Sequence, residues 1–326
     1  MLLILTAPQD EHAAHVQDVL RERGYPVAVF DPADFPGKSS IEIELSSQKL
    51  KSLTLKQENN SLDLLQVRAI WLRRPGRPKA TDELADEVGS FVEQESAAVL
   101  NDLWSLIRCK WIPARPHQLR VAGNKTMQLV AAQDLGFTVP ATVLTNSPTK
   151  VLSFYQQNEG GLISKLASSS LFGLPLGQRL VRFTERVTAA DLVHVNDISL
   201  CPMIFQSYVD KRIELRITII GTSVFAAEIH SQATHHTKTD WRRYDMGNTV
   251  YEPHALPPHI ERQCVALTAF LGLNYSTIDM IVTPNNEYVF LELNPNGQYL
   301  WIEYETGMPL TASLCDLLSS ESEQTE

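Results

Sequence analysis

The sequence lacks the cysteine spacing of a disulfide framework or a zinc site. Four cysteines occur in 326 residues, with no Cys-x-x-Cys pair among them, at Cys109, Cys201, Cys264 and Cys315. Disulfide frameworks belong mainly to small secreted domains that are dense in cysteine. We therefore expect four reduced thiols.

Long apolar runs are also missing. No stretch reaches the roughly 20 apolar residues that a membrane-spanning helix needs. The opening MLLILTAPQDEH turns polar early and has no basic start, which is not the pattern of a secretory signal. We expect a cytoplasmic protein without a membrane partner. With 44% hydrophobic and 20% charged residues, the chain can form two or three packed units.

Excess positive charge is absent as well. The 28 Lys and Arg residues are outnumbered by 38 Asp and Glu residues, which gives a formal net charge of -10. Phosphate backbones are held by clustered cations, so a general nucleic-acid binder is not indicated. Two arginine pairs still stand out, in WLRRPGRP and in DWRRYD. Each is either a solvated surface pair or part of a site.

The spacing of apolar residues predicts three regions of an α/β (α+β) protein. An N-terminal α/β domain over 1–113 opens with a strand, helix and strand within 2–30, continues with strands over 41–56 and 69–72, and closes with one or two helices over 83–111. The proline-containing IPARP at 112–116 is typical of a linker. A central subdomain over 114–200 and a β-rich C-terminal subdomain over 201–326 follow.

Within these regions, the motifs fall on predicted elements. A helix over 125–135 ends at Gly136, and a strand over 162–165 precedes the small-residue loop SSSLFGLPLG. The C-terminal region has a strand over 203–209, a hairpin over 213–229, and a second hairpin formed by 278–283 and 288–294.

The second hairpin carries a candidate metal site. If Thr283 pairs with Tyr288, then Asp279 lies opposite Glu292, with Asn294 further along the same face. Opposed carboxylates repel one another, and oxygen ligands of this kind suit Mg²⁺. The alternative is a solvated hairpin, although the neighbouring positions are apolar and would make an unpaired carboxylate costly.

Two lysines are candidate phosphate ligands. Lys125 lies in the first turn of its helix, where the helix dipole favours an anion. Lys165 ends a strand immediately before the small-residue loop, whose backbone amides can approach phosphate oxygens. Either residue taken alone is more readily explained as an ordinary surface lysine.

The segment FQSYVDKRIELRIT is a candidate base and ribose site. Its connector, Gln206 to Val209, can present backbone groups to a flat base, while Glu214 accepts hydrogen bonds from ribose hydroxyls and Arg216 faces phosphates. The alternative is an exposed strand with a weak surface ion pair.

In chain order these segments resemble the ATP-grasp superfamily, which includes D-alanine ligases and glutathione synthetases. The resemblance covers roughly residues 114–318 and implies an ATP-grasp fold with a pre-ATP-grasp domain before it. It implies ATP and Mg²⁺ as cofactors and assigns each site residue a role: Lys125 and Lys165 on the ATP phosphates, Gln206 and Val209 on adenine, Glu214 on ribose, Asp279, Glu292 and Asn294 on magnesium, and Arg216 and Arg242 on the transferred phosphate.

A closer resemblance spans nearly the whole chain. The strings FDPADFP, AIWLRRP, CPMIFQSYVDKRIELRITIIG, LNYSTIDMIVTP and FLELNPNGQYLWIEYETGMPLT, with YDMGN after DWRR, are similar to the graspetide macrocyclases, the microviridin-type ligases. Such enzymes phosphorylate acidic side chains of a ribosomally made precursor peptide, with leader and core, and join them to Ser or Thr as esters or to Lys as amides. The loop SSSLFGL is poorer in glycine than that of many ATP-grasp enzymes.

Two other functions remain open at the level of sequence. An ATP-grasp ligase of free amino acids or small peptides would use the same nucleotide site, and a non-catalytic binding protein could keep the fold. Asp240 and His230 are both candidates for a general base. A homodimer is compatible with the resemblance.

Overall fold

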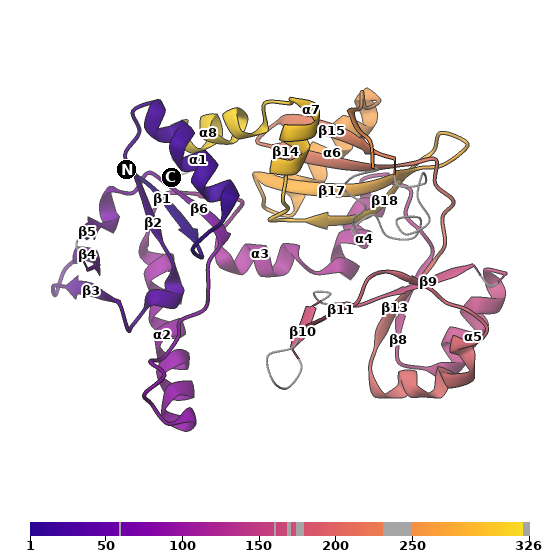
Figure 1. The fold of residues 1–326 in the computed structure, drawn as a ribbon, viewed down its shortest axis with the longest axis horizontal. Coiled ribbons are helices and arrows are strands. Elements are labelled where there is room, and N and C mark those ends of the chain that lie inside the picture. The colour runs from indigo at the N-terminus through magenta and orange to yellow at the C-terminus, as the bar shows by residue number, and fades with distance from the viewer. Residues whose placement is uncertain (59, 160, 168–170, 174–178, 231–248, 322–326) are drawn as a thin grey trace.

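The computed structural model describes residues 1–58, 60–159, 161–167, 171–173, 179–230 and 249–321. Three parts follow one another along the chain in Figure 1. The N-terminal part is indigo to purple, the central part is pink, and the C-terminal part is orange to yellow. The helices and mixed sheets agree with the predicted α/β (α+β) class.

A parallel sheet forms the centre of the N-terminal part, with strand order β2-β1-β6-β7. Its strands are β1 (Leu2–Thr6), β2 (Val27–Phe30), β6 (Ala69–Arg74) and β7 (Lys110–Ile112). Helix α1 (Glu11–Glu22) begins at Asp10, whose carboxylate accepts a hydrogen bond from the backbone N–H of Ala13. The chain turns after the helix at Gly24, which has a φ of +81°.

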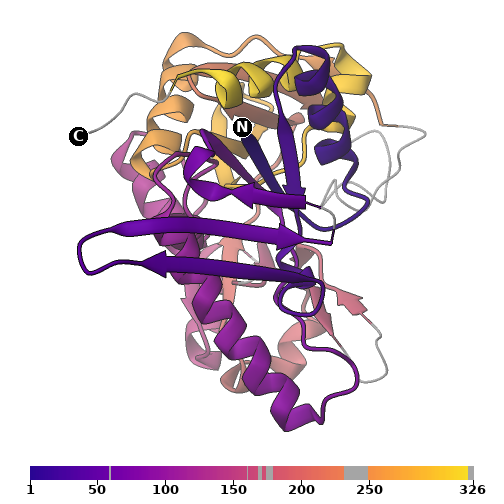
Figure 2. The same ribbon diagram turned by 90° about the vertical axis from the view of Figure 1, so that its left-hand side faces the viewer.

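The other face of this sheet is covered by helix α2 (Asp86–Leu106) and an antiparallel sheet of β3 (Ser39–Leu45), β4 (Leu50–Gln57) and β5 (Asn60–Asp63). Figure 2 shows this purple sheet beside the long helix. The predicted helix over 83–111 is a single helix, and its last residues instead form β7. Trp111 and Ile112 are buried there as part of a fourth parallel strand.

The central part is built on the antiparallel sheet β12-β9-β13-β8. It comprises β8 (Thr142–Thr145), α5 (Pro148–Gln157), β9 (Leu162–Lys165), β12 (Glu185–Arg186), the 3-10 helix Asp191–Leu200 and β13 (Met203–Ser207). Strands β10 (Leu171–Gly173) and β11 (Arg179–Val181) pair as a separate ribbon. Its small core includes Phe154, Leu162 and Phe205.

The C-terminal part contains the five-stranded antiparallel sheet β16-β15-β14-β17-β18. Its elements are β14 (Ile213–Ile220), β15 (Ser223–Ile229), β16 (Tyr251–Pro253), α6 (Pro258–Phe270), β17 (Tyr275–Val282), β18 (Tyr288–Asn294), α7 (Leu300–Thr306) and α8 (Leu310–Ser319). Helices α3 (Pro116–Ala122) and α4 (Lys125–Asp134) also pack on this sheet. Gln128 of α4 bonds both the N–H and the C=O of Leu293 in β18.

Helix α8, near the C-terminus, packs against the N-terminal part of the chain. It lies beside α1 in Figures 1 and 2, and both helices contribute to one core. Leu314 of α8 is fully buried there with Val16 and Leu20 of α1 and with Tyr275 of β17. The N-terminal and C-terminal parts therefore share a core.

The four cysteines are free thiols, as predicted. Burial raises the pKa of Cys109, Cys264 and Cys315 to about 12, so these thiols stay protonated at neutral pH. Among the residues that the structure describes, no helix is both long and apolar enough to cross a membrane.

Candidate functional site

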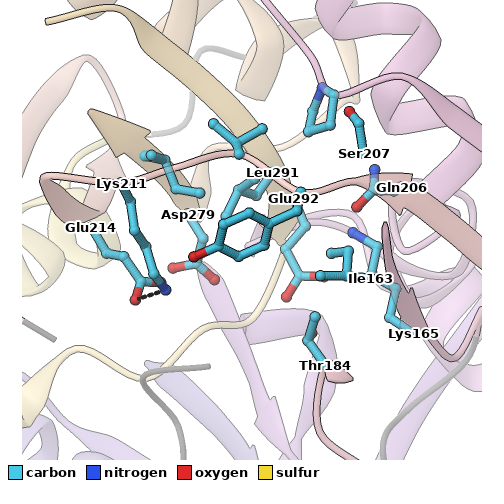
Figure 3. A pocket seen from close by; sticks show the side chains of 14 residues that line it. Ile163, Lys165, Thr184, Gln206, Ser207, Lys211, Glu214, Asp279, Leu291 and Glu292 are labelled. Carbon is cyan, nitrogen blue, oxygen red and sulfur yellow. Dashed lines mark hydrogen bonds and ion pairs between the residues drawn. The ribbon is translucent and has the colours of Figure 1, made fainter. Parts of the chain in front are cut away.

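A cleft of about 680 Å³ lies between the central sheet and the C-terminal sheet. Strand β9 and the β13–β14 connection line one side, and β17 and β18 line the other (Figure 3). Most of the predicted site residues border this cleft, namely Lys165, Gln206, Val209, Glu214, Asp279 and Glu292. Residues separated by more than 100 positions are thereby brought together.

The two candidate metal carboxylates stand directly opposite one another, as predicted. Asp279 of β17 pairs with Glu292 of β18. The predicted Thr283–Tyr288 pair is wrong, because a bulge after Asp279 shifts the register and places Tyr288 opposite Val282. Leu291 is the extra residue of this bulge. The strands near the turn are paired one residue away from the predicted register. The bulge restores the predicted register at Asp279 and Glu292, so these two residues still face one another.

Arg216 is the partner that holds Asp279. It lies opposite Asp279 on β14, and its NH1 donates to both carboxylate oxygens, at 2.9 and 3.0 Å. NH2 of the same guanidinium donates to the carbonyl of Gln298. Arg216 is 5% exposed, so the ion pair is largely shielded from water. Its predicted contact with the transferred phosphate remains a prediction.

The loop after β18 closes over this ion pair through Gly297. A Cβ at this position would lie 1.8 Å from Thr277 Oγ1 and 2.6 Å from Arg216 NH2. The Gly297 carbonyl accepts a hydrogen bond from the hydroxyl of Tyr275 at 2.6 Å. Burial raises the pKa of Tyr275 to about 12, which keeps this donor protonated.

Lys125 reaches the second carboxylate from the start of α4. Asn124 caps this helix by accepting from the N–H of Met127. The Lys125 Nζ lies 3.3 Å from Glu292 Oε2 and donates to the Leu166 carbonyl. A cation, a helix N-terminus and a carboxylate therefore meet at one edge of the cleft.

A second hollow of about 1130 Å³ continues from this edge and has more polar than apolar lining. Lys165 and Glu292 border both spaces, and Lys125 and Asn294 border the second one. Arg74 and Arg182 also line it. These are the cations that suit the phosphates of a nucleotide and the charge of an acidic substrate.

Strands β13 and β14 and the connection between them also line the cleft. Gln206 is fully buried, and its Nε2 donates to Thr142 Oγ1 at 2.9 Å. Its Oε1 has no hydrogen-bond partner among the residues that the structure describes. Glu214 accepts from Lys211 at 2.6 Å, and both side chains are buried (Figure 3). Orphaned and charged groups of this kind fit a polar ligand such as a nucleoside.

The donor set also fits a hard divalent cation. Asp279 and Glu292 offer carboxylate oxygens from paired strands, and both border the cleft. Asn294 follows at the end of β18, where its Oδ1 accepts from the N–H of Asn296. Three oxygen donors without thiol or imidazole are typical of Mg²⁺ sites.

Some of the predicted residues cannot be placed. Arg242, Asp240 and most of the loop SSSLFGLPLG lie outside the described residues. His230 follows β15 and borders neither of the two spaces. Sequence reasoning missed Lys211, which no motif marked, and Arg182. The pair Arg73–Arg74 was noticed, but nothing in the sequence indicated that β6 would reach this site.

The part of β6 nearest the site is tied to the loop that follows β18. Arg73 is 1% exposed, forms an ion pair with Asp10, and donates from NH1 to the carbonyl of Asn296. The Asn296 amide in turn donates to the carbonyls of Leu72 and Arg73. The N-terminal part thereby positions the loop that carries Asn294 and Gly297.

Known protein families match the chain in two consecutive segments. The MvdD pre-ATP-grasp domain matches residues 1–118, and the RimK-like ATP-grasp domain matches residues 122–318. The second match covers more than half of the chain. The chain belongs to the RimK-like ATP-grasp family. The predicted ATP-grasp fold with a preceding domain is confirmed.

Solved structures assign the chain to a branch of this family. It is 30% identical to the macrocyclase MdnC of Microcystis aeruginosa MRC, solved with its precursor peptide MdnA, with 98% of this chain and 99% of that chain covered and a TM-score of 0.85. A Chryseobacterium gregarium RiPP-associated ATP-grasp ligase, solved with ADP and a leader and core peptide, is 28% identical over 97% and 96%, with a TM-score of 0.90.

The macrocyclase MdnB of the same Microcystis is 28% identical over 98% of both chains, with a TM-score of 0.81. These full-length matches place this ATP-grasp protein among the peptide macrocyclases, as the sequence strings predicted. No curated protein sequence matches the chain.

Proposed function

We propose that this ATP-grasp protein is an ATP-dependent peptide macrocyclase. It activates Asp or Glu side chains of a precursor peptide and joins them to Ser or Thr hydroxyls of the same peptide. The observation that carries this proposal is that Lys125, Lys165, Asp279 and Glu292 line two adjoining spaces, with Lys165 and Glu292 bordering both. The full-length similarity to two macrocyclases supports peptide as the substrate class.

ATP is the nucleotide that this cleft would bind. The buried Gln206 and the backbone through Val209 would contact the base, and Glu214 would accept from the ribose. Lys165 and Lys125 border the polar hollow and would hold phosphates. The similarity to a ligase solved with ADP supports an adenine nucleotide as the ligand of this cleft.

Asp279, Glu292 and Asn294 would hold magnesium. A bound Mg²⁺ would neutralise negative charge on the ATP phosphates during phosphoryl transfer. The chain itself supplies position and charge around these phosphates. Arg216 orients Asp279 through its two hydrogen bonds, and Lys125 forms an ion pair with Glu292.

The chemistry proceeds in two transfers. A substrate carboxylate oxygen attacks the γ-phosphorus of ATP, the bond to the β-phosphate oxygen breaks, and ADP leaves with an acyl phosphate formed. A substrate hydroxyl then attacks the acyl carbon, loses its proton, and expels inorganic phosphate. Activation is needed because a carboxylate resists attack, whereas phosphate is a good leaving group. Positioning and electrostatics are the enzyme's contribution.

The precursor peptide is proposed to have a leader and a core, as in the complex of the Chryseobacterium ligase. The polar hollow with Arg74 and Arg182 suits an acidic core segment. Ester formation is proposed over amide formation with Lys. Action in the cytosol, assembly as a homodimer, and the divisions 1–113, 114–200 and 201–326 remain predictions.

The test is co-expression with each small peptide encoded beside the gene, followed by mass spectrometry. The proposal expects loss of one water for each link and ADP release that depends on the peptide. Hydroxylamine cleaves esters and leaves side-chain amides intact. If the dehydrated peptide resists hydroxylamine and its fragments map the cross-link to Lys, the product is an amide and the proposed ester is wrong. ADP release with free amino acids, and no dehydrated peptide, would support the small-molecule ligase instead.

A further inference from the structure

A second group of ionisable residues lies on the face of the C-terminal sheet opposite the nucleotide cleft. Glu228 of β15 pairs with Leu215, which pairs with Met280. Directly paired residues point to the same face of a sheet. Leu215 and Met280 are buried under α6, whereas Glu214 and Arg216 alternate onto the cleft face. Glu228 is therefore separated from the cleft by the thickness of the sheet.

Three side chains converge at this place from two neighbouring strands. Glu228 and His230 share one face because they are two positions apart, and Glu252 of β16 is paired directly with Glu228. One donor atom from each residue can be chosen such that all three lie within 4.8 Å of one another. Two carboxylates directly opposite one another repel, which makes a cation between them favourable.

Glu228 is held in place from outside the group. Its Oε1 lies 2.6 Å from His254 Nδ1, and His254 Nε2 lies 2.8 Å from the hydroxyl of Tyr288. This chain of contacts runs from β18 to β15 and fixes the carboxylate. Outer hydrogen bonds that orient a ligating carboxylate are a regular feature of metal sites.

The nitrogen of His230 gives an independent indication. Its Nε2 is inaccessible to solvent and lies 3.1 Å from Glu228 Oε2. The geometry is not that of a hydrogen bond, and within the described part of the chain this nitrogen has no hydrogen-bond partner. An imidazole nitrogen without a hydrogen bond, next to a carboxylate, can serve as a metal ligand. The nitrogen and the oxygen are close enough for one ion to bind both.

We propose that Glu228, His230 and Glu252 bind a divalent transition-metal ion of the zinc class. One imidazole and two carboxylates, with a water in the fourth position, make a ligand set that suits Zn²⁺ better than Mg²⁺. Ligand atoms in a tetrahedral zinc site are about 3.4 Å apart, given bonds of about 2.1 Å. Glu252 is exposed and can move inward to complete the site.

The bound ion would fasten β16 to the rest of the sheet. Strand β16 is a three-residue edge strand whose only neighbour in the sheet, among the described residues, is β15. A bond from Glu252 through the metal to Glu228 and His230 crosses this edge. This role in fastening the edge strand is independent of the proposed macrocyclase activity.

The experiment uses the full-length protein, stripped with a chelator and then held in excess Mg²⁺ to fill the predicted magnesium site. Zn²⁺ binding is measured by calorimetry, and Co²⁺ is added as a visible probe of tetrahedral coordination. We expect one ion per chain, a visible Co²⁺ band, and a rise in melting temperature with Zn²⁺.

The variants separate this site from the magnesium site. His230→Gln and Glu252→Gln should each weaken Zn²⁺ binding at least tenfold, and His254→Gln should weaken it roughly 10- to 100-fold as an outer partner. Glu292→Gln and the exposed helical Glu261→Gln should leave it unchanged. The exposed position of Glu252 makes its variant safe for folding.

Two results would overturn the proposal. One is the absence of any Zn²⁺ or Co²⁺ binding in excess Mg²⁺. The other is binding that Glu292→Gln abolishes while Glu252→Gln and His230→Gln keep it within twofold, because the ion would then occupy the magnesium site. In either case the group formed by Glu228, His230 and Glu252 is not a metal site.

Discussion

Single side chains around the cleft have separable tasks, and Glu292 is the clearest to test. Glu292→Gln keeps the side-chain volume but removes a charged magnesium ligand and the partner of Lys125. We expect ATP-dependent turnover to fall by roughly 100-fold or more, with the fold retained. ADP release at limiting magnesium, with circular dichroism as the check on folding, measures this. Glu287→Gln, in the exposed β17–β18 turn, is the matched control. Wild-type activity of the Glu292 variant would show that Glu292 is not a magnesium ligand.

Lys165 is the residue to test for nucleotide binding. Lys165→Ala should raise the Kd for ATP roughly 10- to 100-fold, because a charge-assisted phosphate contact contributes about 1.5–3 kcal/mol. Calorimetry with a non-hydrolysable ATP analogue gives the affinity. Lys150→Ala on the exposed face of α5 should change nothing. Equal affinities for both variants would show that Lys165 does not contact the phosphates.

His12 makes stability depend on pH. Its Nε2 accepts the N–H groups of Tyr299 and Leu300, so the ring must stay neutral. Burial, followed by the nearby Arg73, lowers the pKa of His12 to about 3 from 6.5. Between these values the unfolded chain binds more protons, so stability is lost as pH falls below 6.5.

The expected loss from this histidine is about 2 kcal/mol between pH 6.5 and pH 5. Urea unfolding at a series of pH values measures it. His12→Gln keeps an acceptor that does not titrate, and its stability should vary less over this window. An identical pH slope in the variant would assign the dependence to other groups.

At the scale of elements, the loop between β18 and α7 depends on Gly297. Gly297→Ala would place a methyl group against the buried Thr277 and against Arg216. Overpacking of this kind costs about 1–3 kcal/mol, and displacement of Arg216 should lower turnover more than stability. Thermal unfolding and ADP release give the two values. Gly89→Ala inside α2 meets only ordinary contacts and should be neutral or slightly stabilising.

At the scale of the whole molecule, α8 makes the N-terminal and C-terminal parts one folding unit. Leu314 is fully buried in the core that α1 and β14 share. Leu314→Ala should cost about 2–5 kcal/mol and should destabilise both parts together, in one calorimetric transition. Leu200→Ala, at a position 86% exposed, should stay within about 0.5 kcal/mol. A variant in which only one part melts early would show that the core is not cooperative.

Local patterns in the sequence were sufficient for most helices and strands and for the facing pair Asp279 and Glu292. Their signals lie within a few residues, since apolar spacing, turn residues and caps act over one or two turns of chain. Strand β7 was missed because its buried Trp111 and Ile112 continue the apolar spacing of α2. The bulge at Leu291 was missed because nothing in the local pattern marks an extra residue.

Tertiary structure alone decided what surrounds those carboxylates. Arg216 pairs with Asp279 across 63 positions, and Arg74 reaches the same site from β6 although its sequence context is only that of a basic pair. The sharing of one core by α1 and α8, and the separation of Glu228 and His230 from the cleft, depend on strand order and on which face each residue takes. Side chains determine local geometry by short-range sterics, whereas contacts between distant segments are selected by burial of the whole chain, which no short window of sequence contains.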